Sequence, residues 1–167
     1  VTVTADGKTY VASAGMPPAI EIDSLGTEYQ EGGGFGSEAE EGYRLHVYFT
    51  DNPGISDYGR IKFSRNLLNS MDYYLYVGKF SDGRQIDYNH FYDVFAAGDT
   101  IRVQLIAMDE AVYDYFSTLH EVVAGEEGAS TFDATPSNPN TNWSGGALGY
   151  FGAFNARLSR IIVDDTR

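Results

Sequence analysis

Alternation of apolar and polar residues predicts several short strands over the first two thirds of the chain. The clearest run extends from Tyr43 to Thr50, where every second residue is apolar. Similar patterns begin at Tyr58 and at Asp72; the second extends to Phe80, with Tyr73, Leu75 and Val77 on one side. A short strand pattern covers Gln85 to Asp87, and the aromatic stretch from Tyr88 to Ala97 is expected to be irregular. Because successive side chains of a strand point to opposite faces, each run predicts one buried face and one exposed face.

The first twelve residues predict a β-hairpin. Two alternating runs flank Asp6-Gly7, a dipeptide that favours the tight turns of hairpins. A short strand pattern returns at Ile20 and ends at Leu25. From Gly26 to Gly42 the chain is rich in Gly and Glu, and we expect a mobile, solvated loop there.

One stretch, from Ala97 to Gly125, combines a turn, a strand and a helix. Gly98-Asp99 predicts the turn. The strand face that follows is formed by Ile101, Val103, Leu105 and Ala107. Asp109 is a favourable N-cap and Gly125 a favourable C-cap for a helix whose apolar residues recur at helical spacing. The apolar stripe of this helix comprises Val112, Tyr115, Phe116, Leu119, Val122 and Val123.

The end of the chain returns to a strand pattern. Gly145 to Phe154 alternates small and large residues, and its glycines predict a bulge or a close approach of backbone segments. Arg157 to Val163 predicts the last strand. Since the connections resemble hairpins, we expect a mainly β fold. It would be an antiparallel β-sandwich of about eight short strands, with one amphipathic α-helix packed against it, in a single domain of residues 1–167.

The chain has a formal net charge of −13. Its 11 Lys and Arg residues are scattered along the sequence, so no local basic cluster offsets the 24 Asp and Glu residues. A strongly negative protein repels nucleic-acid phosphates and anionic lipid headgroups. We therefore expect no nucleic-acid partner, and we attribute the acidity to solubility.

The absence of cysteine limits the chemistry further. It excludes disulfides, thiolate catalysis and cysteine-ligated zinc or iron–sulfur sites. No stretch approaches the ~18 consecutive apolar residues of a transmembrane helix, so we expect no membrane span in this chain. The chain begins directly in strand-like sequence, without a signal-peptide pattern, and we interpret it as a piece of a longer precursor.

The order of several short motifs resembles a known family. The motifs are Lys8-Thr9-Tyr10-Val11-Ala12, Met16-Pro17, Ile22-Asp23-Ser24-Leu25, Phe49-Thr50-Asp51, Ala97-Gly98-Asp99-Thr100, the helix from Asp109 to Leu119, Asn138-Pro139, Asn142 and Gly145 to Ala153. In this order they resemble the C-terminal portion of the domain-of-unknown-function family 4249. The resemblance covers nearly the whole chain, and Gly32 to Gly36 lies outside its pattern.

This resemblance implies a cell-envelope location. Members of the family look like surface or periplasmic lipoproteins of Bacteroidetes, often encoded beside TonB-dependent outer-membrane transporters. They usually carry an N-terminal β-rich domain and a lipidated Cys. The resemblance therefore implies that this chain is the C-terminal part of a longer lipoprotein anchored in the outer membrane, with residues 1–12 as candidates to pair with the missing N-terminal domain. It implies no catalytic residues, because the family has none assigned.

Candidate catalytic groups do not form a recognisable motif. The nucleophile elbow Gly-x-Ser-x-Gly is absent, although the sequence does not exclude a Ser-His-Asp triad formed by distant residues. His46, His90 and His120 lack metal-ligand spacing and lie in different predicted elements. Two carboxylates that flank a glycosidic bond can hydrolyse it. The candidate pairs are Asp87 with Asp93 and Asp109 with Asp114. We predict no catalytic residue.

A calcium site is the one metal hypothesis that the acidic residues suggest. Asp51, Asn52 and Asp57 supply oxygen atoms in one loop. Their spacing differs from that of a standard calcium loop, and Asp51-Asn52-Pro53-Gly54 favours a turn. We therefore predict no metal site and no cofactor, while calcium near Asp51 and Asp57 stays an open alternative.

Aromatic side chains give the best binding hypothesis, since they make up 14% of the chain. Exposed rings on a sandwich can stack on sugar faces or anchor a protein partner. The alternative is that the rings cover the second face of a sheet or pack under loops, as tyrosines on strands often do. The candidate ligand-binding aromatics are Tyr74, Tyr76, Tyr88, Phe91, Tyr92 and Trp143.

Three functions follow in order of preference. The first, which depends on the resemblance, is a non-enzymatic cell-envelope module that binds a ligand or partner at a TonB-dependent outer-membrane uptake system. The second is a carbohydrate-binding module that holds a glycan with surface Tyr and Trp side chains. The third is a hydrolase with paired carboxylates. The sequence identifies no specific ligand, transporter or oligomeric state.

Overall fold

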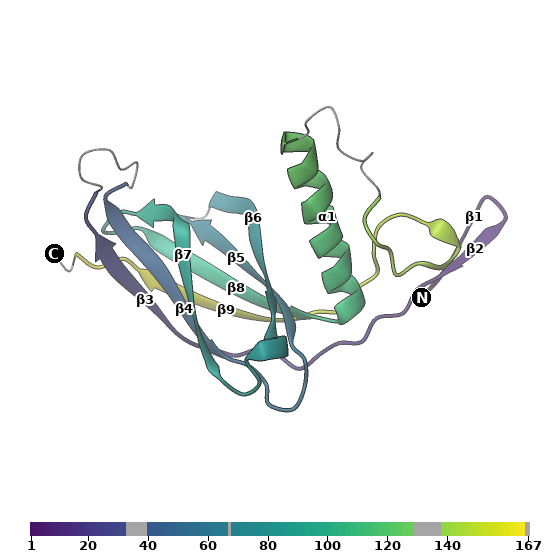
Figure 1. Cartoon of the computed structure of the whole chain (residues 1–167), viewed down its shortest axis with the longest axis horizontal. Coiled ribbons are helices and arrows are strands. Elements are labelled where there is room, and N and C mark those ends of the chain that lie inside the picture. The colour runs from purple at the N-terminus through teal and green to yellow at the C-terminus, as the bar shows by residue number, and fades with distance from the viewer. Residues whose placement is uncertain (33–39, 67, 129–137, 166–167) are drawn as a thin grey trace. The chain divides into compact units, whose positions relative to one another are not determined.

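The computed structural model describes residues 1–32, 40–66, 68–128 and 138–165, with the backbone alone at 68–72, 91–92 and 124–128. These residues contain nine strands and one α-helix (Figure 1). The fold is mainly β with antiparallel sheets and one helix, as predicted, and has more strands than the eight or so expected. Two 3₁₀ helices, η1 (Gly78–Phe80) and η2 (Ser144–Gly146), complete the described elements.

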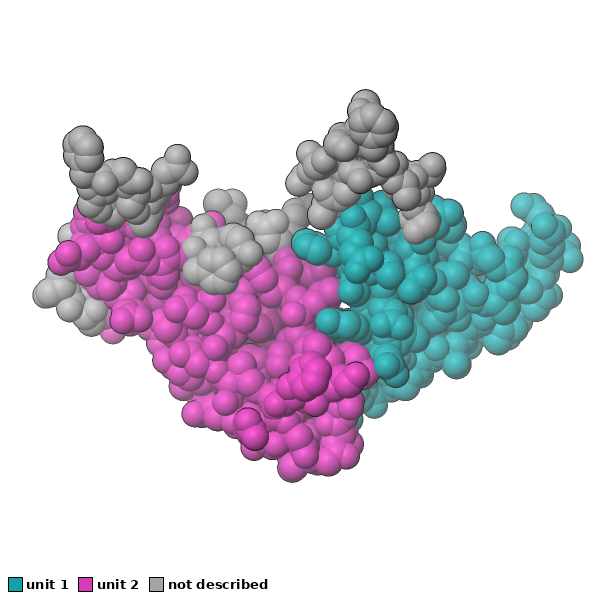
Figure 2. All heavy atoms as spheres, in the orientation of Figure 1, with its two compact units in different colours: residues 1–18, 107–155 teal, residues 19–106, 156–167 magenta. Residues whose placement is uncertain are grey.

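The chain forms two compact units, which Figure 2 colours separately. Unit 1 comprises residues 1–18 and 107–155. Unit 2 comprises residues 19–106 and 156–167. Each unit has its own contacts and is described by itself below.

Unit 2 is built from two sheets. The strands β3 (Ile22–Gln30), β4 (Gly42–Thr50) and β7 (Gln85–Phe95) form a three-stranded sheet in the order β3-β4-β7. The strands β5 (Tyr58–Arg65), β6 (Leu68–Val77), β8 (Thr100–Met108) and β9 (Asn155–Ile162) form a four-stranded sheet in the order β6-β5-β8-β9. The last two residues of β8 and the first of β9 belong to unit 1.

The core of unit 2 lies between these two sheets. Its buried side chains include Tyr43, Leu45, Val47 and Phe49 of β4, Ile61 and Phe63 of β5, and Ile101, Val103 and Leu105 of β8, all at positions where the alternation predicts them. Ring contacts join the sheets. Phe49 meets Tyr76 of β6 with centroids 4.9 Å apart, and Phe63 meets His90 of β7 at 4.6 Å. These contacts make unit 2 a sandwich.

Strands β3 and β7 are longer than predicted. β3 continues to Gln30, inside the stretch expected to be a loop, because Gly26 to Gln30 pairs with β4. The rest of that predicted loop, including residues 33–36, lies largely outside the described residues. β7 reaches Phe95, although the aromatic stretch after Asp87 is predicted to be irregular. Pairing with β4 keeps it extended.

Strand β6 differs from its prediction at both ends and in its faces. It begins at Leu68 rather than Asp72, and the residues after Val77 form η1 instead of continuing the strand. Its register places Tyr74 opposite Ile61, whose side chain is buried. Tyr74 and Tyr76 therefore face the interior. Since both faces of β6 are apolar, alternation alone does not distinguish them.

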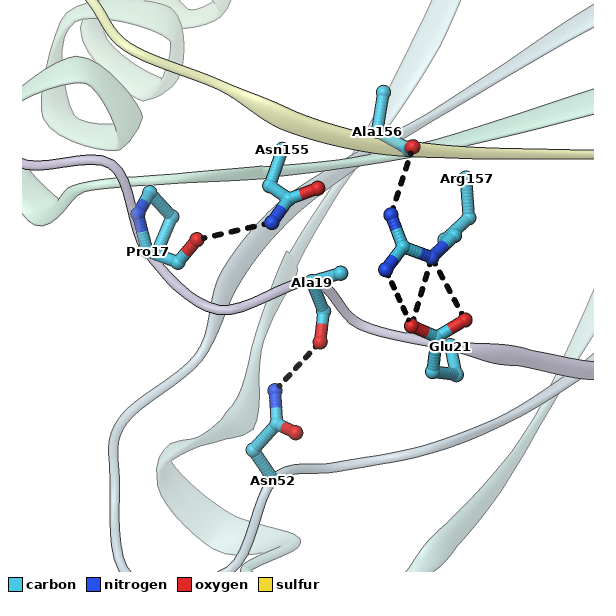
Figure 3. A network of polar contacts seen from close by, with 7 residues as sticks. All are labelled: Pro17, Ala19, Glu21, Asn52, Asn155, Ala156 and Arg157. Atoms are coloured by element: carbon cyan, nitrogen blue, oxygen red, sulfur yellow. Dashed lines mark hydrogen bonds and ion pairs between the residues drawn. The ribbon is translucent and has the colours of Figure 1, made fainter.

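Polar contacts hold the segment that leads into β3 (Figure 3). The Arg157 guanidinium of β9 binds the Glu21 carboxylate at 2.7 Å. This hydrogen bond holds the pKa of Glu21 below its usual value. Asn52, in the loop after β4, donates its side-chain N–H to the carbonyl of Ala19 at 3.1 Å.

Unit 1 begins with the predicted hairpin, β1 (Thr2–Ala5) and β2 (Lys8–Val11). Asp6 and Gly7 have φ angles of 51° and 73°, the positive pair that a tight primed turn requires. Ala12 then pairs with Trp143 in an isolated bridge. The amide side chain of Asn142 strengthens this region, since it exchanges two hydrogen bonds with the backbone of Phe151, at 2.7 and 2.9 Å.

The helix α1 (Glu110–Gly128) begins where the sequence predicts. Asp109 caps it: Oδ1 accepts the N–H of Val112 at 3.0 Å, and Oδ2 accepts the N–H of Gly15 at 3.0 Å. The predicted end at Gly125 is wrong, because the helix continues to Gly128. A glycine costs only about 1 kcal/mol inside a helix, and the glutamates that follow favour helix.

The apolar stripe of α1 is covered by residues 150–154 within unit 1. Tyr150 packs against Tyr115 and Phe116 with ring centroids 4.8 and 5.0 Å apart. At Gly152 the backbone lies close against side chains rather than against another backbone segment: an added Cβ would lie 2.7 Å from Cζ of Phe154 and 3.2 Å from Cγ2 of Val112. Val123, about two turns beyond Phe116, is 48% exposed and is not part of the buried stripe.

Candidate functional site

Three of the predicted ligand-binding tyrosines lie between the sheets of unit 2. Tyr74 of β6 packs against Tyr88 of β7 with ring centroids 5.3 Å apart. Tyr76 contacts Phe49 edge-to-face and donates its hydroxyl hydrogen to Asp51. All three tyrosines are half-buried. Because their rings contact other rings of the chain, their packing is that of interior residues.

Of the other three predicted aromatic residues, the structure describes the side chain of one. Trp143 lies in unit 1, is half-buried and packs against Phe151 with ring centroids 6.2 Å apart. Phe91 and Tyr92 belong to β7, but their side chains lie outside the described residues. The structure therefore brings three of the six candidates together, and binding through the other three stays a prediction.

The two candidate carboxylate pairs do not converge. Asp87 contacts His46 on the outer face of the three-stranded sheet, whereas Asp93, beyond a register shift in β7, contacts His90, whose ring packs between the sheets. The carboxylates of glycosidases are about 5–9.5 Å apart. Asp109 caps α1 with both carboxylate oxygens, whereas Asp114 is exposed on the helix. Neither pair offers the geometry for glycoside hydrolysis.

Two histidines lie on opposite faces of the three-stranded sheet. On the outer face, His46 Nδ1 is 2.9 Å from Asp87 Oδ1, and its Nε2 is 3.4 Å from Glu28 Oε2. In the interior, His90 Nε2 is 2.8 Å from Asp93 Oδ2. The intervening sheet separates the two imidazoles, so they do not share a site.

Two almost inaccessible carboxyl groups lie in the loop between β4 and β5. Asp51 and Asp57 are 0% and 2% exposed. Asp57 accepts hydrogen bonds from the backbone and side-chain N–H groups of Asn52, at 2.7 and 3.1 Å. Asp51 Oδ1 accepts the Tyr76 hydroxyl at 2.8 Å. These donors occupy oxygen atoms that a calcium ion would need, since calcium takes six to eight oxygen ligands.

Removing the charge of Asp51 should change how stability depends on pH. Burial raises the pKa of Asp51; the Tyr76 hydrogen bond opposes this rise, and nearby Asp57 adds to it. The stability contributed by protonated Asp51 is therefore complete below the ordinary pKa of an aspartate and declines as the pH rises toward the raised pKa. Asp51→Asn cannot ionise, so we expect its advantage over the native chain to grow with pH, by about 1.4 kcal/mol per pKa unit of the rise.

Urea unfolding from pH 4 to pH 8 measures this difference. Asp82→Asn, at an exposed aspartate in the turn before β7, is the matched control and should leave the pH profile unchanged. A constant difference between Asp51→Asn and the native chain at every pH would mean that folding does not raise the pKa of Asp51.

A cavity of about 410 Å³ lies in unit 2, where β3 ends and β4 begins. Its lining includes the rings of Tyr29, Tyr43 and Phe95 and the carboxylates of Glu40 and Glu41. Tyr29 meets Tyr43 edge-to-face with centroids 5.2 Å apart and donates its hydroxyl hydrogen to Glu41. A cavity of this size, with apolar rings and a few polar groups, is typical of small-molecule sites.

Arg65, at the end of β5, contributes a fixed charge to the cavity wall. Its Nη2 is 2.6 Å from Asp99 Oδ2, and its guanidinium lies 5.6 Å from the centroid of Phe95. Burial alone would raise the pKa of Asp99, but hydrogen bonds from the Ala96 N–H, Asn66 and Arg65 outweigh it and hold the pKa below its usual value. The ionised carboxylate anchors this wall at the turn that Gly98-Asp99 predicts.

A second cavity, of about 380 Å³, borders the first at Tyr29. It is lined by Glu28, Tyr29, Gln30, Arg44 and Asn89. Neither cavity is predicted from the sequence, because the pattern predicts a loop where β3 carries Tyr29. The tyrosine itself, placed between glutamates in a predicted loop, was the available signal.

Comparisons with known proteins give one match. A family model described as Domain of unknown function (DUF4249) matches residues 1–160. No curated protein and no solved structure matches the chain. In the described part of the chain, no helix has the length and apolar character to cross a membrane, and no group of three or more His, Asp or Glu side chains is arranged to hold a metal ion.

Proposed function

The chain belongs to the domain-of-unknown-function family 4249, and from this premise we propose that it is a non-enzymatic, ligand-binding module of the cell envelope. In this proposal it serves as an accessory domain of a TonB-dependent outer-membrane uptake system. The envelope location and the transporter association are the expectations that accompany the family resemblance. The ligand-binding part depends on the molecule itself.

The observation that carries the proposal is the cavity beside Tyr29. Its volume of about 410 Å³ suits a small molecule. Tyr43 and Phe95, 1% and 4% exposed, give it a rigid apolar floor, while Glu40 and Glu41 place negative charge at its rim. A pre-formed floor of this kind lowers the entropy cost of binding.

The arrangement of the candidate catalytic groups also supports a binding role. Asp109 is occupied as a helix cap, and Asp87 and Asp93 lie on opposite faces of one sheet with His46 and His90. A hydrolase needs two such groups on the same side of one substrate.

Filling the cavity should abolish small-molecule binding. Ala97 lines the cavity and is exposed, so Ala97→Trp adds bulk there without disturbing the core. The probes are sugars, amino acids, short peptides, organic amines and fatty acids, each added to the purified chain in a thermal-unfolding assay. We expect at least one class to raise the unfolding midpoint of the native chain, and its affinity to fall at least tenfold in Ala97→Trp.

Ala5→Trp, at an exposed position in β1, is the matched control and should bind like the native chain. Unchanged affinity in Ala97→Trp would mean that the ligand binds outside this cavity. No midpoint shift with any class would contradict the ligand-binding proposal.

A further inference from the structure

Three neighbouring strands of the four-stranded sheet carry basic residues and no acidic ones. β5, β8 and β9 contain no Asp or Glu, in a chain with 24 of them. They hold six of the 11 Lys and Arg residues: Arg60, Lys62, Arg65, Arg102, Arg157 and Arg160. Basic residues that are scattered along the sequence are therefore brought onto neighbouring strands by the pairing of the sheet.

Four of these residues share the outer face of the sheet. In β5, Gly59, Ile61 and Phe63 are buried, so Arg60 and Lys62 point the other way. In β8, buried Ile101, Val103 and Leu105 leave Arg102 on that same outer face. In β9 the exposed positions alternate, and Arg160 is one of them. We call Arg60, Lys62, Arg102 and Arg160 the basic face.

The two arginines of β8 and β9 lie close together. The N–H of Val163 donates to the carbonyl of Asp99 at 2.9 Å, where β9 ends beside the start of β8. Counting back along the two strands brings Arg160 level with Arg102. Like charges directly opposite each other destabilise a sheet. The pair therefore does not stabilise the sheet, and an acidic group placed against it would offset the repulsion.

Three of the four residues of the basic face carry charges that no carboxylate of the described chain neutralises. Lys62, Arg102 and Arg160 form no ion pair there, whereas Arg65 and Arg157 are held by Asp99 and Glu21. Large apolar side chains flank the free charges. On β9, Leu158 is 71% and Ile162 55% exposed. Arginine beside exposed aliphatic residues is typical of protein–protein interfaces.

We propose that the basic face docks a partner protein through a segment that combines acidic and aliphatic residues. Charge complementarity argues against a second copy as the partner, because twofold symmetry would bring two basic faces together. An anionic membrane presents the same sign of charge as the proposed segment, and the vesicles described below distinguish the two. That the partner is an envelope protein rests on the proposed function, but the face itself does not depend on it.

Carbodiimide coupling tests this docking surface directly, because it joins an amine to a carboxylate in contact. The probe is poly-L-glutamate, mixed with the purified chain at low salt. We expect Lys62 to couple more efficiently than the exposed Lys8 and Lys79, and coupling to fall as salt screens the charges. In a second experiment, binding of the purified chain to vesicles of phosphatidylglycerol and phosphatidylcholine is measured.

Reversing the charge of two arginines of the basic face provides a variant that tests the same binding. Arg102→Glu with Arg160→Glu should reduce poly-L-glutamate affinity at least tenfold, and Lys8→Glu with Lys79→Glu, which changes the net charge equally, should leave it unchanged. Circular dichroism verifies that each variant folds, and Lys62→Gln, alone, repeats the test if the double variant does not fold. Equal losses in both double variants, or binding to vesicles but not to poly-L-glutamate, would overturn the proposal. Neither result would affect the cavity or its ligand.

Discussion

Replacing Phe49 by alanine should destabilise the chain by about 3–5 kcal/mol, the usual cost of removing a buried aromatic side chain. Phe49 is 0% exposed, lies on the inner face of β4 and meets the ring of Tyr76 at 4.9 Å. Truncation would open a cavity between the two sheets and remove this edge-to-face contact. Urea unfolding followed by far-ultraviolet circular dichroism measures the loss.

Phe80→Ala is the matched control for this change. Phe80 belongs to η1 and is 84% exposed, so the same truncation should cost less than about 0.5 kcal/mol. Similar losses for the two variants would mean that the interior of unit 2 does not lie between these sheets.

Replacing Phe116 by alanine should cost about 3–5 kcal/mol for a similar reason, but in unit 1. Phe116 is 6% exposed and packs against Tyr150, with ring centroids 5.0 Å apart. Without it, α1 loses the main contact with the segment that covers its stripe. Hydrogen exchange should show loss of protection in α1 and in residues 150–154 before it appears in β4.

The control on the same helix is Val123→Ala. Val123 is 48% exposed, and alanine has the higher helix propensity, so this variant should unfold within about 0.5 kcal/mol of the native chain. Loss of protection in β4 at the same rate as in α1 after Phe116→Ala would indicate that Phe116 supports the whole chain rather than unit 1.

Local patterns predict the fold wherever one face of an element is buried and the other exposed. β4 and β8 obey this rule, so alternation identifies their inward residues correctly. The N-cap at Asp109 and the turn at Asp6-Gly7 are also predicted, because each depends on a few adjacent residues.

Elements that depend on distant partners are predicted less well. β7 has aromatic residues on both sides of its alternation, and its pairing with β4 defines it as a strand. β3 continues through Gly26 and Thr27 for the same reason. Backbone hydrogen bonds to a neighbouring strand override weak local propensity.

The candidate binding residues also depend on distant partners, so local patterns predict them poorly. The alternation predicts that Leu75 and Val77 point inward, which leaves Tyr74 and Tyr76 on the exposed face as candidate binding residues. The pairing of β6 with β5 reverses this assignment and turns the two tyrosines inward. The basic face forms no continuous motif along the chain, since Lys62, Arg102 and Arg160 come from three distant segments. Its sequence signal is the absence of Asp and Glu from three predicted strands.

Carbodiimide cross-linking in membranes of the native host, with the full-length protein, tests the central claim most directly. The proposed function predicts that the protein fractionates with the envelope, and the basic face adds the prediction that Lys62 is coupled to an acidic residue of a TonB-dependent transporter. Lys62→Arg keeps the charge but cannot form this amide, so it should lose the cross-link and keep the association. Recovery of the protein outside the envelope, or cross-links to the transporter through Lys8 and Lys79 but not Lys62, would contradict the account.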